Sequence, residues 1–367
     1  MDKLDDLKLI STIDRKGMLH VLDKVPEICF DALKIGKKIE VAGINEEITR
    51  ILFVGMGGSS IGASLFKDWA INKATLPMDV CRDYILPEYV DKHTLVFLVS
   101  YSGDTEETLN ALLQSLKRQC PIIGLSSGGL LEKLCLKKKV THIKIPEGFQ
   151  PRAALPYLFI SISKTLEKLG IVEGVDDEAD EAIETLRRIQ EKIKVSIQSD
   201  KNDAKRIALN IIGTIPVIYG YREFTNVAYR LKTQLNENSK ILSKFETFPE
   251  LDHNEVVGWS GTPTHLTNLI SVILIRDTNE PEEIKTRIEI TKKIISEKTN
   301  RIFEIYAEGE TKMARMLSTI YYGDFISFYL AILNGVDPTP VDIIKRMKQE
   351  IEEKTGLLQK IKRQSEL

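Results

Sequence analysis

The sequence predicts an α/β protein with two parallel β-sheets, because short apolar runs alternate with segments of helical periodicity in each half of the chain. In the first half, five such runs are expected strands: 51–57, 78–84, 94–100, 121–127 and 141–146. The segments between them carry apolar residues at helical spacing. Near-continuous apolar strands joined by helices indicate a parallel sheet that is covered on both faces.

The alternation restarts after a charge-rich segment, 174–197, whose apolar spacing predicts a long amphipathic helix. Four further strands are expected at 214–221, 240–248, 269–277 and 301–309, followed by a long apolar helix at 314–336. Two similar halves suggest an internal duplication. We therefore expect four parts: an N-terminal subdomain (1–170), a bridging helix (171–200), a C-terminal subdomain (201–336) and a C-terminal helix (337–367).

The bulk composition is that of a globular protein without a nucleic-acid or membrane partner. Of 367 residues, 43% are hydrophobic and 28% charged, and the formal net charge is -2, so no global field attracts nucleic acid or anionic lipid. No C-x-x-C spacing occurs among the four cysteines, which argues against a zinc site and suits a reducing compartment. With no secretory signal and no apolar run near the roughly 20 residues of a membrane helix, we expect a cytoplasmic protein.

A glycine-rich loop, GMGGSSIG (55–62), follows the first expected strand and leads into a helix. Glycines allow a ligand to approach the backbone closely, and a helix N-terminus offers amide groups and a positive dipole to an anion. A dinucleotide site has a similar loop, and Asp83 near the end of the second strand keeps that alternative open. Plain turn geometry is the other alternative.

A hydroxyl-rich stretch, SYSGDTEETL (100–109), follows the third expected strand. Asp104 and Glu107 fit a capping box, in which each side chain bonds an amide of the first helical turn. Capping leaves the other hydroxyl residues of the stretch unexplained: Ser100, Ser102, Thr105 and Thr108. Because ligands of α/β sheets bind beyond the carboxyl ends of strands, and no G-K-[ST] motif is present, a small phosphorylated ligand fits better than a nucleotide.

The two loops together, GMGGSS and then SYSGDTEE, resemble the sugar isomerase (SIS) domain. Four later segments extend the resemblance to the bifunctional phosphoglucose/phosphomannose isomerase family: QPRAALPYLF (150–159), LNENSK (235–240), FPELDHNEVVGW (248–259) and the segment 321–348. The resemblance implies two SIS-type, flavodoxin-like subdomains, each a parallel sheet sandwiched by helices, plus a C-terminal helix that completes the active site. It also implies a homodimer that uses no metal or organic cofactor.

The family resemblance further implies an activity: interconversion of glucose 6-phosphate and mannose 6-phosphate with fructose 6-phosphate through an enediol. By resemblance, five residues would hold the phosphate and neighbouring sugar oxygens: Gly58, Ser59, Ser100, Ser102 and Thr105. One departure from the family pattern is Asp104, where asparagine is common. We expect its side chain to turn away from the phosphate and to cap the following helix. Thr339 in VDPTP is expected near the end of the substrate, and whether it influences C2 specificity stays open.

Two further residues acquire roles by the same resemblance, and the chemistry is consistent with them. Glu237 would be the base, since a carboxylate over the C1–C2 bond can take a proton from one carbon and return it to the other. Arg152 would stabilise the enediolate, because an arginine stays protonated. Without the resemblance, Glu237 would be interpreted as a solvated loop residue and Arg152 as a surface residue at a helix start.

Ring opening requires one proton delivered to the ring oxygen and one removed from the anomeric hydroxyl, which a histidine can do near neutral pH. The resemblance assigns this step to His253, contributed across the dimer interface, and to Lys348; His265 is the rival histidine. Lys348 belongs to the basic run KRMK, where Lys345 and Arg346 are its rivals and a solvated helix face is the alternative.

Three other functions remain as alternatives to the bifunctional isomerase. One is a phosphoglucose isomerase with little mannose activity. Another is a non-enzymatic SIS regulator that senses sugar phosphates, but the roughly 45 residues before the first strand are too few and too acidic for a helix-turn-helix. The third is a dinucleotide-dependent oxidoreductase that uses GMGGSS.

Overall fold

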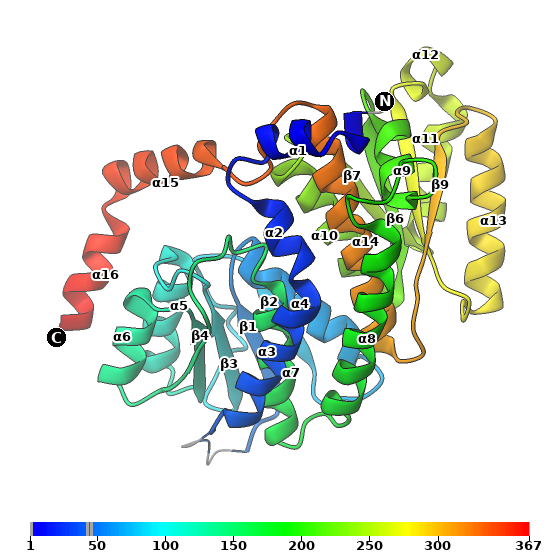
Figure 1. Ribbon diagram of the computed structural model, residues 1–367. Helices are drawn as coiled ribbons and strands as arrows, with labels where there is room; N and C mark the ends of the chain where they lie inside the picture. The colour runs from blue at the N-terminus through cyan, green and yellow to red at the C-terminus, as the bar shows by residue number, and fades with distance from the viewer. Residues whose placement is uncertain (1–2, 42–43, 45–46, 367) are drawn as a thin grey trace. The chain divides into compact units, whose positions relative to one another are not determined.

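The computed structural model describes residues 3–41, 44 and 47–366. The chain forms two compact units, each built on one parallel sheet. The sheet A unit comprises Glu27–Asp176 and Val341–Leu367, and the sheet B unit comprises Met1–Pro26 and Asp177–Pro340. The labels of their helices and strands are those of Figure 1.

Sheet A has five parallel strands in the order β2-β1-β3-β4-β5. Their bounds are β1 Arg50–Val54, β2 Met78–Cys81, β3 Thr94–Val99, β4 Ile122–Ser126 and β5 Thr141–Lys144. Strands β1 and β3 are neighbours, with Val54 opposite Leu98, so their carboxyl ends meet at one edge of the sheet. This edge carries the loops that the sequence singles out.

The helices of the sheet A unit cover both faces of its sheet. They are α3 Val25–Lys38, α4 Gly58–Ala70, α5 Glu106–Lys117, α6 Gly129–Lys137, α7 Leu155–Lys168, α15 Asp342–Thr355 and α16 Leu357–Glu366. Successive strand residues alternate between faces. Leu52 and Leu98 accordingly join an apolar cluster with α5, α6 and α16, whereas Phe53 packs against Phe66 of α4 on the opposite face.

Sheet B has four parallel strands in the order β7-β6-β8-β9. The strands are β6 Ile215–Tyr221, β7 Lys244–Phe248, β8 Ile270–Arg276 and β9 Ile302–Tyr306. The larger helices of this unit are α8 Val175–Ile193, α9 Asp203–Ile211, α10 Thr225–Glu237, α13 Glu282–Ser296 and α14 Lys312–Leu333. Its shorter ones are η1 Lys3–Asp5, α1 Leu7–Ile13, α2 Met18–Asp23, η2 Arg222–Phe224, η3 Glu250–His253, α11 Glu255–Gly261 and α12 Thr264–Thr267.

Helix α14 is the central helix of the sheet B unit and packs against α9 and α10. By length and composition alone it could cross a membrane, and it is the one described helix of which this is true. The apolar stretch that gives it this character is entirely buried within the protein. Because a membrane helix would expose that surface to lipid, α14 has the character of a core helix.

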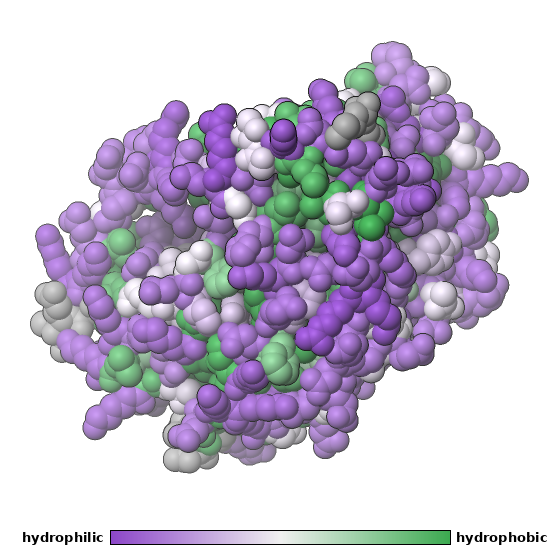
Figure 2. All heavy atoms as spheres, viewed as in Figure 1, coloured by the Kyte–Doolittle hydropathy of each residue, from purple (hydrophilic) through white to green (hydrophobic). Residues whose placement is uncertain are grey.

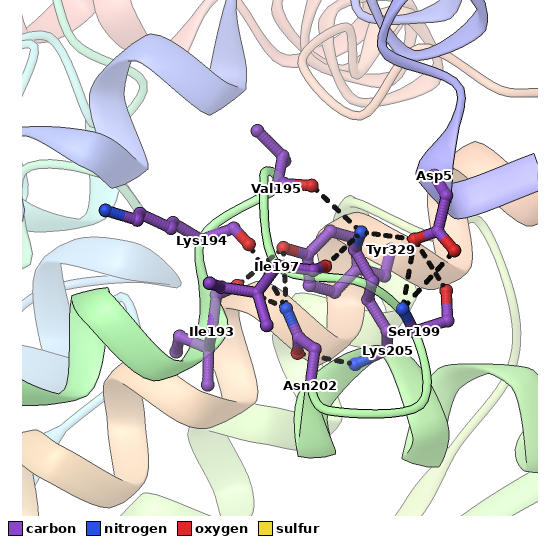
Figure 3. A network of polar contacts seen from close by, with 9 residues as sticks. All are labelled: Asp5, Ile193, Lys194, Val195, Ile197, Ser199, Asn202, Lys205 and Tyr329. Carbon is purple, nitrogen blue, oxygen red and sulfur yellow. Dashed lines mark hydrogen bonds and ion pairs between the residues drawn. The ribbon is translucent and has the colours of Figure 1, made fainter.

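Residues 3–26 belong to the sheet B unit and contact α14, although they precede sheet A in the sequence. A buried lysine, Lys205 of α9, holds them: its ammonium donates to Asp5 Oδ1 at 2.9 Å and to two carbonyl oxygens, of Val195 and Ile197 (Figure 3). The same Asp5 carboxylate accepts bonds from the amide and the hydroxyl of Ser199. Burying a charge is favourable only when it is paired and hydrogen-bonded, and this network meets that condition.

The predicted fold class is confirmed, and each of the nine expected strands overlaps an observed one. The unit boundaries follow spatial contact rather than chain order, so residues 1–26 and 341–367 each join the sheet that is remote in sequence. The expected C-terminal helix is two helices, α15 and α16, which meet at Gly356. Gly356 has φ 57°, a left-handed conformation that ends α15.

Candidate active site

The glycine-rich loop and the hydroxyl-rich loop touch at the carboxyl edge of sheet A. The Ser59 Oγ accepts a hydrogen bond from the Tyr101 amide at 2.9 Å, and Ser59 is buried. A Cβ placed on Gly55 would lie 2.7 Å from the carbonyl oxygen of Val99, so only glycine permits the two strand ends to come this close. The proximity predicted from the sequence is therefore present, and a serine side chain holds it.

The hydroxyl groups of the second loop are organised around Ser100, which is fully buried. Its Oγ lies 2.8 Å from Thr105 Oγ1 and accepts a bond from the Gly103 amide at 3.1 Å. Because one of the two hydroxyl protons bridges Ser100 and Thr105, the other can be donated elsewhere. Ser59 likewise accepts from Tyr101 and keeps its own proton. The loops can thus offer hydroxyl protons to an anion without losing their internal bonds.

Two helix N-termini reach the same edge of sheet A. Helix α4 begins at Gly58 and α5 at Glu106, and the N-cap residue of neither helix makes a side-chain cap bond. Gly57, which precedes α4, has φ 52° and ψ -126°, a backbone conformation accessible to glycine. Helix N-termini and hydroxyl donors together favour a phosphate group at this edge.

The predicted capping role of Asp104 is wrong for α5. Thr105 is the N-cap residue of α5 and makes no side-chain cap bond, whereas Asp104 Oδ1 accepts a bond from the Leu130 amide at 2.9 Å, in the first turn of α6. Gly103, with φ 72°, turns the chain against the loop that begins α6; a Cβ there would lie 1.9 Å from a carbonyl oxygen of that loop. A contact between segments 26 residues apart thus replaces the local capping box. Ser102 is exposed, and its Oγ accepts a bond from the Asp104 amide at 3.3 Å.

Arg152 lies directly behind the glycine-rich loop. The residue is 2% exposed, and its backbone amide would be 2.8 Å from a Cβ placed on Gly58. The QPRAAL segment forms the turn that precedes α7, and the glycine allows that turn and the start of α4 to pack together. An arginine stays protonated, so this buried residue carries a permanent positive charge close to the start of α4.

Lys348 lies across a cavity of about 150 Å³ from the start of α5. The cavity is lined on one side by Tyr84 and by the residues 104–107, and on the other by α15 and α16 residues that include Lys348. Of its rivals, Lys345 pairs with Asp342 and Arg346 with Glu350, and neither lines this cavity. Among the described residues, Lys348 is the one cation of the KRMK run in contact with the cavity.

Sequence reasoning missed a second layer around the two loops. Arg82, just after β2, donates to Ser60 Oγ at 3.1 Å and to Ser64 Oγ at 2.7 Å, both on α4. Tyr84 donates to a carboxylate oxygen of Glu106; this bond, together with burial, raises the pKa of the tyrosine. No sequence pattern marks these pairs, because they depend on the order β2-β1-β3 of the sheet. Asp83, which in the sequence supports the alternative of a dinucleotide site, accepts a hydrogen bond from the amide of the next residue, Tyr84.

In the sheet B unit, Glu237 is the last residue of α10. The neighbouring Asn238 donates to Ser327 Oγ of α14 at 2.9 Å, and Ser239 Oγ donates to the Ser327 carbonyl, so the end of α10 is tied to the core helix. Lys240 Nζ bonds the carbonyl oxygens of Glu237 and Pro338. The VDPTP turn, which contains Thr339, therefore lies beside the LNENSK segment.

The histidines of the sheet B unit are exposed. His253 is the last residue of η3, directly after β7, and His265 lies on the short helix α12. Asp252, beside His253, is held by α13, where Arg287 and Thr291 donate to its carboxylate at 3.1 and 2.7 Å. The backbone that carries His253 is thus anchored, while its imidazole faces outward.

Glu237 and His253 of one chain lie at opposite ends of β7. Helix α10 starts after the carboxyl end of β6 and returns to the start of β7, where Asn236 donates to Ser243 Oγ at 3.2 Å. His253 follows the far end of the strand. Five strand residues span about 15 Å at roughly 3.3 Å each. The two side chains that the resemblance assigns to one reaction therefore do not meet within one chain.

Comparison with known proteins decides the family. A bifunctional phosphoglucose/phosphomannose isomerase of Caldicellulosiruptor bescii is 40% identical over 340 residues, which cover 92% of this chain and 100% of that protein. The chain belongs to the bifunctional phosphoglucose/phosphomannose isomerase family. A second member, from Aquifex aeolicus, is 37% identical over 82% of this chain and 90% of its own length.

Two further comparisons concern the fold. The model of the bacterial phospho-glucose isomerase C-terminal SIS domain matches residues 200–351, which include the whole of sheet B. A glucose-6-phosphate isomerase like protein from Thermus thermophilus has a similar structure, with a TM-score of 0.61, 19% identity, and coverage of 95% of this chain and 99% of that chain. The SIS-type architecture predicted from the two loops is confirmed.

Proposed function

We propose that this protein interconverts glucose 6-phosphate and mannose 6-phosphate with fructose 6-phosphate. Family membership supports the reaction, and one observation in the structure supports it most directly: Ser59 binds the backbone of Tyr101, which brings two hydroxyl-rich loops together at the carboxyl edge of sheet A. Those loops would hold the phosphate through Gly58, Ser59, Ser100, Ser102 and Thr105. The exposed side chain of Ser102 is accessible to a ligand even though its oxygen already accepts a backbone amide.

The proton transfers would use the four residues that the family resemblance assigns to them. The Glu237 carboxylate would take the C2 proton of the open-chain aldose, leaving an enediol, and would return it to C1 to give the ketose. The Arg152 guanidinium would stabilise negative charge on the enediolate oxygens. Ring opening would precede this step, with His253 and Lys348 moving protons at the ring oxygen and the anomeric hydroxyl.

A homodimer would supply His253 to the active site of the other subunit. The support is geometric, because Glu237 and His253 of one chain lie at opposite ends of β7. His253 is exposed at a position that α13 anchors through Asp252, as suits a side chain presented to another copy. In a two-fold dimer each subunit would complete the site of its partner. We further propose a cytoplasmic location, in keeping with four cysteines that are all buried and free.

A two-substrate assay tests the activity. With glucose 6-phosphate and with mannose 6-phosphate, each without added metal, we expect fructose 6-phosphate to form. Turnover of the glucose ester alone would reduce the function to phosphoglucose isomerase. Saturable binding of both esters without turnover of either would favour a sugar-phosphate-binding regulator.

The role of Glu237 is tested by Glu237→Gln, which keeps the shape of the side chain but removes the base. We expect turnover to be lost while sugar-phosphate binding survives, because the phosphate loops are unchanged. Glu297→Gln is the matched control, since Glu297 is an exposed glutamate of the same unit. Near-normal turnover by Glu237→Gln would remove Glu237 from its role.

The shared site is tested by mixing two inactive variants, Glu237→Gln and His253→Ala. In a mixed dimer, one site would contain both substitutions and the other would contain neither, so a random equimolar mixture should recover about a quarter of wild-type activity. If both residues served the site of their own chain, every site in the mixture would carry one substitution. No recovery, with subunit exchange verified by mass spectrometry, would therefore contradict the shared site.

A further inference from the structure

The helix that carries Lys348 has almost no packing of its own. No residue of α15 is buried, although the helix is 14 residues long. On the face of the molecule shown in Figure 2, α15 is mostly hydrophilic. Most helical stability in proteins comes from packing of an apolar face, so a helix of this kind must be held by a neighbouring element.

The neighbouring element is α16, which follows α15 and packs on α5 (Figure 1). Its Ile361 is 1% exposed and belongs to the apolar cluster of the sheet A unit, together with Leu109 and Leu112 of α5. Leu357 and Leu358 are partly buried against the same cluster. The tail of the chain is therefore inserted into the core that supports the hydroxyl-rich loop.

Glu352 of α15 links the two helices through hydrogen bonds. Its carboxylate accepts bonds from the amides of Leu358 at 3.0 Å and Gln359 at 3.3 Å, which caps the N-terminus of α16. The amide of Gly356 donates to the Glu352 carbonyl at 2.8 Å and closes the turn between the helices. Because Glu352 follows Lys348 by one helical turn, and both line the cavity at the start of α5, the cap fixes the part of α15 that faces this cavity.

We propose that α16 is an anchor that positions Lys348 for the reaction, with Ile361 and Glu352 as its positioning residues. This inference rests on the proposed role of Lys348. The anchor packs on α5, the helix whose N-terminus carries Thr105 and the hydroxyl-rich loop. It therefore sets the position of Lys348 relative to that loop. Neither positioning residue needs to touch the substrate. Ile361 and Glu352 would then affect the reaction only through Lys348.

The primary variant is Ile361→Ala, compared with Gln364→Ala, a change of an exposed residue on the same helix. We expect kcat to fall about 10- to 100-fold in Ile361→Ala, because a displacement of about 1 Å of a catalytic group has effects of that size. KM for the sugar phosphate should change little, since the phosphate loops are retained. Gln364→Ala should leave both constants unchanged, and Ile361→Val should restore most of kcat.

Two further measurements separate positioning from a general loss of structure. In a Lys348→Ala background, Ile361→Ala should cause no additional fall in kcat, because residues that act through one group are not additive. Glu352→Gln, which leaves the apolar anchor intact and weakens only the cap, should lower kcat in the same direction. Hydrogen exchange of residues 342–355 should accelerate in both Ile361→Ala and Glu352→Gln, while exchange in β1 and β3 stays slow.

An additive fall of kcat in the Lys348→Ala background would overturn the proposal, as would unchanged exchange of α15 in both variants. If Ile361→Ala does not fold, Glu352→Gln decides the question by the same two measurements. If the wild-type protein does not isomerise either sugar phosphate, the proposed function fails, whereas the exchange measurement still shows whether α16 anchors α15.

Discussion

We expect a large loss of stability when one charge of the buried Arg230–Asp324 ion pair is removed. The Arg230 side chain, on α10, is 3% exposed and that of Asp324, on α14, is 9% exposed. Arg230 Nη2 donates to both carboxylate oxygens, at 3.0 and 2.8 Å, and Gln234 Nε2 donates to one of them at 2.9 Å. The perturbation is Asp324→Asn, which keeps the volume of the side chain and removes its charge.

The expected magnitude follows from burial. Asp324→Asn leaves a guanidinium without its counter-charge inside the sheet B unit, and breaking a buried pair in this way costs about 3–5 kcal/mol of the free energy of unfolding. The matched control is Asp203→Asn, which breaks a pair with Arg206 at a similar distance, 2.9 Å, between side chains that are 58% and 61% exposed. Solvent screening limits the cost of the control to about 1 kcal/mol or less.

Urea unfolding monitored by circular dichroism measures both changes. A third variant, Arg230→Met with Asp324→Leu, removes both charges together and should be more stable than Asp324→Asn, because no buried charge is left unpaired. Since α10 ends at Glu237, isomerase activity should also fall in Asp324→Asn. A cost for Asp324→Asn no larger than that of Asp203→Asn would refute the argument that burial sets the magnitude.

Three other predictions follow from the sheet A unit. Gly103→Ala should abolish activity or folding, because its Cβ would lie 1.9 Å from a carbonyl oxygen. The control is Gly170→Ala, at a similar φ of 69° but in open space, which should cost about 1–2 kcal/mol by thermal unfolding. Equal effects of the two substitutions on stability would exclude the clash. Ser59→Ala should cost about 1–3 kcal/mol of the free energy of unfolding, because the buried Tyr101 amide loses its acceptor. If Ser59 binds the phosphate as proposed, the variant should also raise KM, and an unchanged KM in steady-state assays would contradict that role. Burial lowers the pKa of His142 below its usual value near 6.5, so the unfolded state binds more protons in acid and the free energy of unfolding should fall as the pH drops below about 6.5. Between pH 8 and pH 5, the urea midpoint of His142→Asn should therefore fall less than that of the wild type. An equal fall in both proteins would exclude His142 as the source.

Local pattern predicted most of the architecture. The central strands could be located because they are short apolar runs bounded by loop residues, and the long apolar segment at 314–336 corresponds to α14. The edge strands β2, β5 and β7 mix apolar with polar residues and were located from the alternation of strands and helices. The meeting of the glycine-rich and the hydroxyl-rich loop was also predictable, since the segments directly after neighbouring parallel strands lie at one edge of the sheet. The roles proposed for Glu237, His253 and Lys348 depend on family resemblance, because a single carboxylate, imidazole or ammonium in a polar segment carries no local signal.

The sequence by itself determined the α/β class, the order of strands and helices, and the two loops with their glycines, because periodicity and backbone conformation are local properties. Only the tertiary structure decided that Asp104 caps α6, that Ser59 binds Tyr101, and that residues 3–26 join the sheet B unit, where Lys205 binds Asp5. It also decided that Glu237 and His253 lie at opposite ends of β7 in one chain. Each of these features depends on contacts between segments that are remote in sequence. The packing of the sheets brings those segments together, and no local propensity determines which of them meet.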